Sequence, residues 1–124
     1  GIALEYEADL GGAQGMSCGG RVVILEGLGA AEEFATLAHE LAHELLHRDK
    51  ATRPASKTVR ETEAEAVAYI VCTAAGLQAG STASDYIQLY QGDAETLTAS
   101  LERIQQTAAA LIAAFHTSEK RGAA

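Results

Sequence analysis

The chain has 124 residues and is 48% hydrophobic, which is enough for one compact core and argues against a second domain. Its formal net charge of −8 argues against broad binding to nucleic-acid phosphates, which depends on clustered Lys and Arg side chains. No apolar run reaches the roughly 20 residues of a membrane span, and the first residues do not resemble a signal peptide. We therefore expect a cytoplasmic protein.

Residues 1–124 are expected to form this single domain. The chain begins with Gly1 rather than methionine, which suggests either a fragment of a longer protein, with a region upstream, or a processed product. Nucleic-acid binding is not expected of this domain alone, and would belong to that upstream region. Residues 117–124 are expected to be a disordered tail.

Strand patterns come first along the chain. Residues 2–6 alternate in polarity, and residues 13–25 have the pattern of two strands joined at Gly19-Gly20, a pair suited to a tight hairpin turn. We predict a small antiparallel sheet or hairpin at about residues 2–25. Cys18 lies beside this turn, and its distance from Cys72 matches neither a Cys-x-x-Cys metal pair nor a disulfide framework. Both cysteines are expected to be reduced, with Cys72 in the core.

Helical patterns fill the rest of the chain, so the predicted class is α+β, with helices gathered on one side of the sheet. A first long helix is predicted from about Ala31 to His47 and a second over "VRETEAEAVAYIVCTAAGL", ending near Gly76. Ser84 or Asp85 would cap a short third helix. The last helix is predicted from Asp93 to about Phe115.

The segment between the first two helices, "RDKATRPASKT", has the composition of a loop and is rich in positive charge. Five of the nine basic residues lie in or beside it: Arg48, Lys50, Arg53, Lys57 and Arg60. We interpret them as a solvated charge run, and the alternative is a mobile flap that meets substrate.

The first long helix contains the motif "HELAH". His39 and His43 are one turn apart on a helix, about 40° round from each other, so both imidazoles can bind one ion. His-Glu-x-x-His is the arrangement in which two neutral imidazoles hold zinc and the glutamate, here Glu40, acts as general base. The motif therefore predicts a Zn²⁺ site with Glu40 as the catalytic residue.

His47 continues the four-residue spacing, but it is about 12 Å along the helix from His39, which is too far for both rings to bind one ion in tetrahedral geometry. We expect His47 to be a polar group in the last helical turn, with a role behind the ligands or facing substrate as the alternative. The metzincin pattern also fails, because position 49 is Asp rather than a third histidine. His116 is more typical of a solvated residue than of a ligand.

A third ligand is expected from the carboxylates of "RETEAEA" on the second helix. Glu61 and Glu65 share a face with small alanines, whereas Glu63 points elsewhere. Glu61 can therefore reach the ion while Glu65 accepts a ring N–H from a ligating histidine. The alternative is that all three are exposed acids at the start of a helix.

These two helices resemble the gluzincin layout, in which the third ligand opens a Glu-x-x-Ala-Asp/Glu signature. More closely, "FATLAHELAHELLH" and "RETEAEAVAYIV" resemble ImmA/IrrE-type metallopeptidases and the zincin domain of ArdC-like antirestriction proteins, over about residues 13 to 115. The resemblance implies a zincin-like fold and a zinc metalloendopeptidase with His39, His43 and Glu61 as ligands. It also implies that Glu65 lies behind them.

The resemblance further implies a protein or peptide substrate that adds to an edge strand of the hairpin, roughly residues 13–25. The chain departs from the family pattern at Ala42, where glycine is frequent, and it lacks the single-stranded-DNA-binding region of ArdC-like proteins. Tyr69 and Tyr86 are expected to pack in the core, with oxyanion stabilisation as the alternative role.

Two rival functions stay open. In the first, the 17 Asp and Glu residues imitate DNA phosphates, and the domain is an antirestriction binding module. In the second, the motif only holds a structural zinc ion without catalysis.

Overall fold

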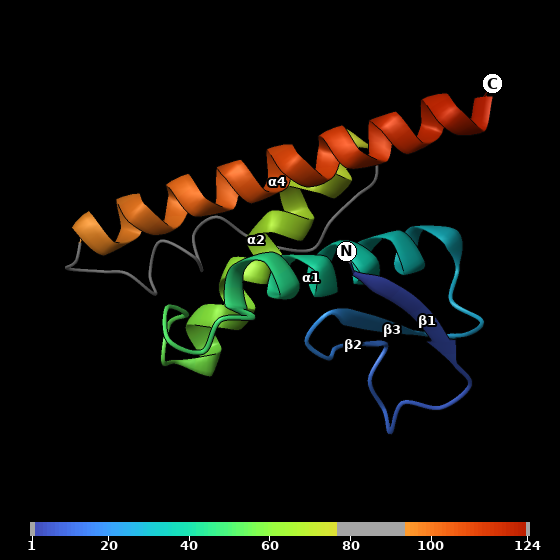
Figure 1. Cartoon of the computed structure of the whole chain (residues 1–124), viewed down its shortest axis with the longest axis horizontal. Coiled ribbons are helices and arrows are strands. Elements are labelled where there is room, and N and C mark those ends of the chain that lie inside the picture. The colour runs from blue at the N-terminus through green and yellow to red at the C-terminus, as the bar shows by residue number, and fades with distance from the viewer. Residues whose placement is uncertain (1, 77–93, 124) are drawn as a thin grey trace.

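The computed structural model describes residues 2–76 and 94–123 of the chain (Figure 1). Within these ranges three strands come first: β1 (Ala3–Glu7), β2 (Gly15–Ser17) and β3 (Arg21–Leu25). They are followed by three helices: α1 (Ala30–His47), α2 (Lys57–Ala74) and α4 (Ala94–Ala123). This order confirms the predicted α+β class. The short helix predicted to begin at Ser84 or Asp85 lies outside the described residues.

The three strands form one mixed sheet in the order β1-β3-β2. The expectation of an antiparallel sheet was therefore wrong for β1, which pairs parallel to β3 from Ala3 opposite Arg21 to Glu7 opposite Leu25. Only β2 pairs antiparallel to β3. A tight turn fixes that antiparallel pair, whereas the longer connection over residues 8–14 lets β1 lie along the other edge of β3.

The turn between β2 and β3 confirms the predicted hairpin. Gly19 and Gly20 have φ angles of 65° and 87°, a region that side chains with a Cβ rarely adopt. The backbone N–H of Cys18 donates to the carbonyl of Arg21 at 2.7 Å and closes the turn. The glycine pair thus sets the position of β2.

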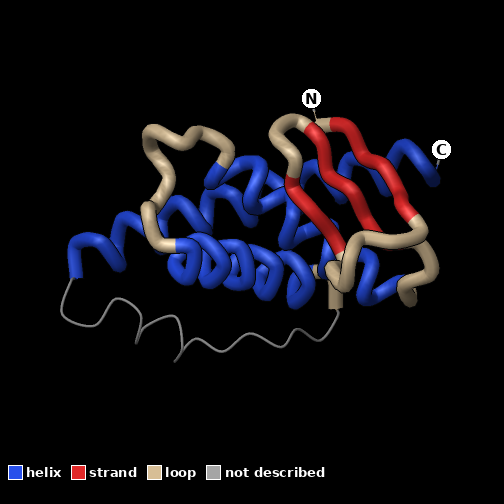
Figure 2. Tube along the Cα trace, turned by 90° about the horizontal axis from the view of Figure 1, so that it is seen from below, coloured by secondary structure: helices blue, strands red, loops and turns tan. Residues whose placement is uncertain are grey.

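Helix α1 lies between the sheet and α4, and α2 packs against both α1 and α4 (Figures 1 and 2). The core between the helices is built largely from small residues: Ala38 and Ala42 of α1, Ala64, Val67, Ala68 and Val71 of α2, and Ile104, Ala108 and Leu111 of α4. Because alanines meet where α1 faces α2, the two backbones approach closely enough for polar side chains of both helices to touch.

The ends of α2 follow from local sequence. The Ser56 hydroxyl accepts a hydrogen bond from the backbone N–H of Val59 at 3.3 Å, which caps the first turn. Gly76, with φ of 81°, follows the last turn, as predicted. Helix α4 continues to Ala123, beyond the predicted end near Phe115. In the described ranges no helix has the length and apolar character needed to cross a membrane.

Candidate metal centre

Three side chains predicted as metal ligands converge between α1 and α2. Oε2 of Glu61 lies 3.0 Å from Nε2 of His39 and 3.2 Å from Nε2 of His43. One donor atom from each residue lies within 4.8 Å of the other two. The structure therefore brings together the three residues that the sequence predicted as ligands. The alternative, in which Glu61, Glu63 and Glu65 are all exposed acids, is wrong because Glu63 is buried.

This donor set fits a tetrahedral zinc ion. Two donors about 2.05 Å from such an ion are about 3.3 Å apart, and the two measured histidine-to-carboxylate distances are close to that value. Burial raises the pKa of Glu61, but the nearby rings of His43 and His39 lower it more, so its net pKa is lowered. Burial also lowers the pKa of His43, which favours the neutral form that ligates metal.

Glu65 occupies the place predicted for it behind His39. One of its carboxylate oxygens lies 2.8 Å from Nδ1 of His39, although the angle is not that of a well-formed hydrogen bond. Contact with His39 lowers the pKa of Glu65, which keeps its carboxylate ionised. Burial lowers the pKa of the His39 ring, but Glu65, Glu40 and Glu61 outweigh that effect and raise it overall. A carboxylate at Nδ1 leaves Nε2 of the ring turned towards Glu61.

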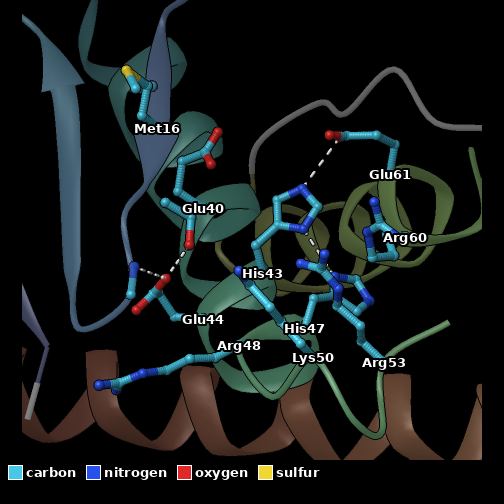
Figure 3. Close-up of a pocket in the computed structure, with 13 residues that line it drawn as sticks. Met16, Glu40, His43, Glu44, His47, Arg48, Lys50, Arg53, Arg60 and Glu61 are labelled. Carbon is cyan, nitrogen blue, oxygen red and sulfur yellow. Dashed lines mark hydrogen bonds and ion pairs between the residues drawn. The ribbon is translucent and has the colours of Figure 1, made fainter. Parts of the chain in front are cut away.

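Glu40 lines a cavity of about 480 Å³ together with His43 and Glu61 (Figure 3). One wall of this cavity comes from strand β2, which contributes Gly15, Met16 and Ser17. Burial raises the pKa of Glu40, and this effect exceeds the opposing effect of His39. A carboxyl group with a raised pKa binds a proton more readily, as a general base must.

His47 lies in the last turn of α1, as expected, and it is buried, with 4% of its surface exposed. Its Nδ1 lies 2.8 Å from Nδ1 of His43, and its Nε2 lies 2.8 Å from Oε1 of Glu63. Of the two roles considered from sequence, the geometry supports the one behind the ligands. The prediction that His47 is not itself a ligand agrees with the donor set found between His39, His43 and Glu61.

A metal ion on Nε2 of His43 would fix the ring protons of this chain of contacts. The proton of His43 would then be on Nδ1 and would be donated to Nδ1 of His47, 2.8 Å away. The proton of His47 would then be on Nε2 and would be donated to Glu63. A buried carboxylate would thus fix the tautomer of His43, a predicted ligand, through a second histidine.

Glu63 was missed as a functional residue. It points away from Glu61 and Glu65, as predicted, but its side chain is fully buried. Its Oε2 accepts hydrogen bonds from the Ser100 hydroxyl and, at 2.9 Å, from Nη2 of Arg103, both on α4. Burial raises the pKa of Glu63, but the hydrogen bonds from His47 and Ser100 outweigh it, so the net pKa is lowered and the carboxylate stays ionised.

Glu44 is a second residue whose role the sequence did not indicate. It is buried and accepts hydrogen bonds from the Ser17 hydroxyl and from the backbone N–H groups of Gly19, at 3.1 Å, and Gly20. Burial raises the pKa of Glu44, but these hydrogen bonds outweigh that effect, so the net pKa is lowered. Glu44 therefore ties the hairpin to α1 one residue after His43, which is a predicted ligand.

The remaining sequence candidates are two tyrosines, His116 and the cysteines. Tyr69 is 43% exposed, so the expectation that it packs in the core was wrong. Tyr86 and the side chain of His116 lie outside the described residues. Cys72 is buried, as predicted, and both cysteines are free.

The charged loop was interpreted as solvated, yet Arg48, Lys50, Arg53 and Arg60 line the same cavity as Glu40 (Figure 3). The alternative, a flap that meets substrate, stays a prediction. No protein-family model matches the chain, and no curated protein or solved structure matches it either.

Proposed function

We propose that this chain is a zinc-dependent peptidase domain with a zincin-like fold. In it His39, His43 and Glu61 hold the zinc ion, and Glu40 is the general base. One observation carries the proposal: the donor atoms of those three residues converge beside a cavity that Glu40 also lines. The resemblance of the two helices to ImmA/IrrE-type metallopeptidases supports the same assignment of roles.

Zinc bound by these residues supplies a Lewis acid that polarises a peptide carbonyl and acidifies water. The carboxylate of Glu40 accepts the proton of the attacking water on an oxygen atom. It then donates that proton to the amine of the departing peptide. His43 keeps its own ring proton on Nδ1, where His47 accepts it, so its Nε2 stays available as a ligand.

The sheet offers a way to bind peptide backbone at this place. Strand β2 is at one edge of the sheet and pairs only with β3 among the described residues. Its residues Gly15, Met16 and Ser17 also line the cavity. An extended peptide that pairs with β2 gains hydrogen bonds from the main chain without requiring a particular sequence. This arrangement supports a protein or peptide as the substrate.

The test uses a random peptide library incubated with the zinc-loaded protein, with cleavage sites identified by mass spectrometry. Glu40→Gln should abolish cleavage while zinc content stays the same, because the amide cannot accept the proton. Glu32→Gln is the matched control, since it removes an exposed carboxylate from the first turn of the same helix and should cleave normally. Chelation should stop cleavage, and added zinc should restore it.

Full cleavage by Glu40→Gln would remove Glu40 from the mechanism. Absence of cleavage by the zinc-loaded protein would refute the peptidase. In that case, a lower unfolding temperature after chelation would indicate a structural zinc site. A salt-sensitive complex with a DNA-binding protein, formed equally well without metal, would instead favour the acidic binding module.

A further inference from the structure

The wall of the cavity formed by residues 48–60 has an unusual charge for this protein. Four basic residues line it, Arg48, Lys50, Arg53 and Arg60, although the whole chain has nine basic residues and a net charge of −8. They belong to the end of α1, the following loop and the first turn of α2. In Figure 3, Lys50 and Arg53 are drawn on the opposite side of the cavity from Met16.

Two of these four residues already have a structural partner. Arg60 donates from Nη1 to the carbonyls of Pro54, at 2.7 Å, and Ala55, at 2.9 Å, and so holds the loop in place. Arg48 lies against Gly20 in the hairpin turn, where a Cβ on the glycine would be 3.0 Å from Nη2. Arg60 therefore helps to position the loop, and Arg48 packs on the hairpin turn.

Lys50 and Arg53 differ from Arg48 and Arg60. In the part of the chain that the structure describes, neither makes an ion pair, although both line the cavity. Two of the three acids of the same cavity have other partners, because Glu44 binds the hairpin turn and Glu61 lies between two histidines, and the third, Glu40, is the proposed general base. Among the described residues, no carboxylate of the cavity pairs with the two cations, which line a space adjoining the proposed catalytic centre.

We propose that the peptide bound in this cavity has an acidic side chain, Asp or Glu, close to the cleaved bond, and that Lys50 and Arg53 bind its carboxylate. This specificity rests on the proposed peptidase function, since it names the substrate of the same site. A carboxylate suits both cations, and Arg can bind it through two parallel hydrogen bonds. The net charge of −8 disfavours binding of such a peptide elsewhere on the surface, which favours its arrival at this basic wall.

The experiment compares peptide selection between variants of the zinc-loaded protein. A random library with equal amounts of Asp and Asn, and of Glu and Gln, is cleaved and the residues at each position around the cut are counted. In parallel, the library is passed over immobilised zinc-loaded Glu40→Gln protein, and retained peptides are counted. Because the second measurement needs binding alone, it tests the acidic preference even if cleavage is absent.

We expect Asp and Glu to exceed Asn and Gln about tenfold at one fixed position, a value set by two partly exposed ion pairs. The double change Lys50→Gln and Arg53→Gln should remove this preference, and Arg53→Lys alone should retain much of it. Lys57→Gln is the matched control, because Lys57 is exposed and does not line the cavity. The preference should also shrink as salt rises from about 0.05 M to about 0.5 M.

Cleavage and retention without any preference for acids would overturn the proposal while leaving the peptidase intact. An acidic preference that survives the double change would also overturn it, because other residues would then be responsible. Retention of acidic peptides without cleavage would support binding by Lys50 and Arg53. It would count against the proposed peptidase activity and not against the acidic preference.

Discussion

The buried contact between His47 and Glu63 makes a prediction about metal affinity that is separate from catalysis. Changing His47 to Phe keeps a ring of similar size but removes the acceptor 2.8 Å from Nδ1 of His43. It also removes the donor 2.8 Å from the buried carboxylate of Glu63. The first loss acts on the metal ligand, and the second acts on the stability of the fold.

The two losses have different expected sizes. Removing a group that orients a ligating histidine typically lowers metal affinity 10-fold to 100-fold. This corresponds to about 1.4 to 2.7 kcal/mol of binding free energy. Glu63 retains Ser100 and Arg103 as donors, so the loss of one donor to this fully buried carboxylate should cost about 1 to 3 kcal/mol of unfolding free energy.

Zinc affinity is measured by competition with a chelating dye, and stability of the metal-free protein by chemical unfolding. A second variant separates the two effects: adding Glu63→Leu to His47→Phe removes the poorly paired carboxylate and should recover part of the stability. Zinc affinity should stay low, because Nδ1 of His43 still lacks its acceptor. Leu45→Phe, at an exposed position in the same turn, is the control for the added ring.

Zinc binding by His47→Phe with the affinity of the natural chain would refute the role of His47. So would recovery of zinc affinity in step with stability in the double variant, because the metal would then respond only to the loss of the fold.

Further predictions concern the sheet and the thiols. Gly15→Ala should destabilise the protein by about 1 to 3 kcal/mol in chemical unfolding, because its Cβ would lie 2.6 Å from Cγ2 of Thr36. Adding Thr36→Ser should recover part of the loss, and an unchanged stability of Gly15→Ala would contradict the close approach. Glu44→Gln should cost about 1 to 3 kcal/mol and speed hydrogen exchange of the turn amides that it now binds, and unchanged exchange would show that the hairpin does not depend on it. Burial raises the pKa of Cys72, so near pH 8 it should react with a thiol reagent only after unfolding, whereas Cys18 should react in the folded protein; equal rates would contradict this.

Much of the candidate site was predictable because its information is local. The spacing of His39 and His43 places them on one face of a helix. Glu61 and Glu65 were chosen because they share a face of the next helix with small residues, and the structure brings both next to those histidines. The hairpin was predictable for the same reason, since the Gly19-Gly20 pair specifies its turn within four residues.

The features that were missed depend on contacts between distant segments. Glu63 was predicted to point away from Glu61 and Glu65, and it does. Its role was missed because a helical pattern does not reveal that α4 covers that side of α2. Its partners Ser100 and Arg103 come about forty residues later. The parallel pairing of β1 is another such case, because β3 accepts a strand on each edge and the local pattern of β1 does not specify its direction.

The central claim is that two imidazoles of α1 and one carboxylate of α2 bind a single zinc ion. Native mass spectrometry of the zinc-loaded chain measures this directly, by comparing the natural sequence with Glu61→Ala and with Glu102→Ala, which removes an exposed carboxylate from α4. We predict one zinc ion in the natural chain and in Glu102→Ala, and a large loss of zinc in Glu61→Ala. Full retention of zinc by Glu61→Ala would contradict the account.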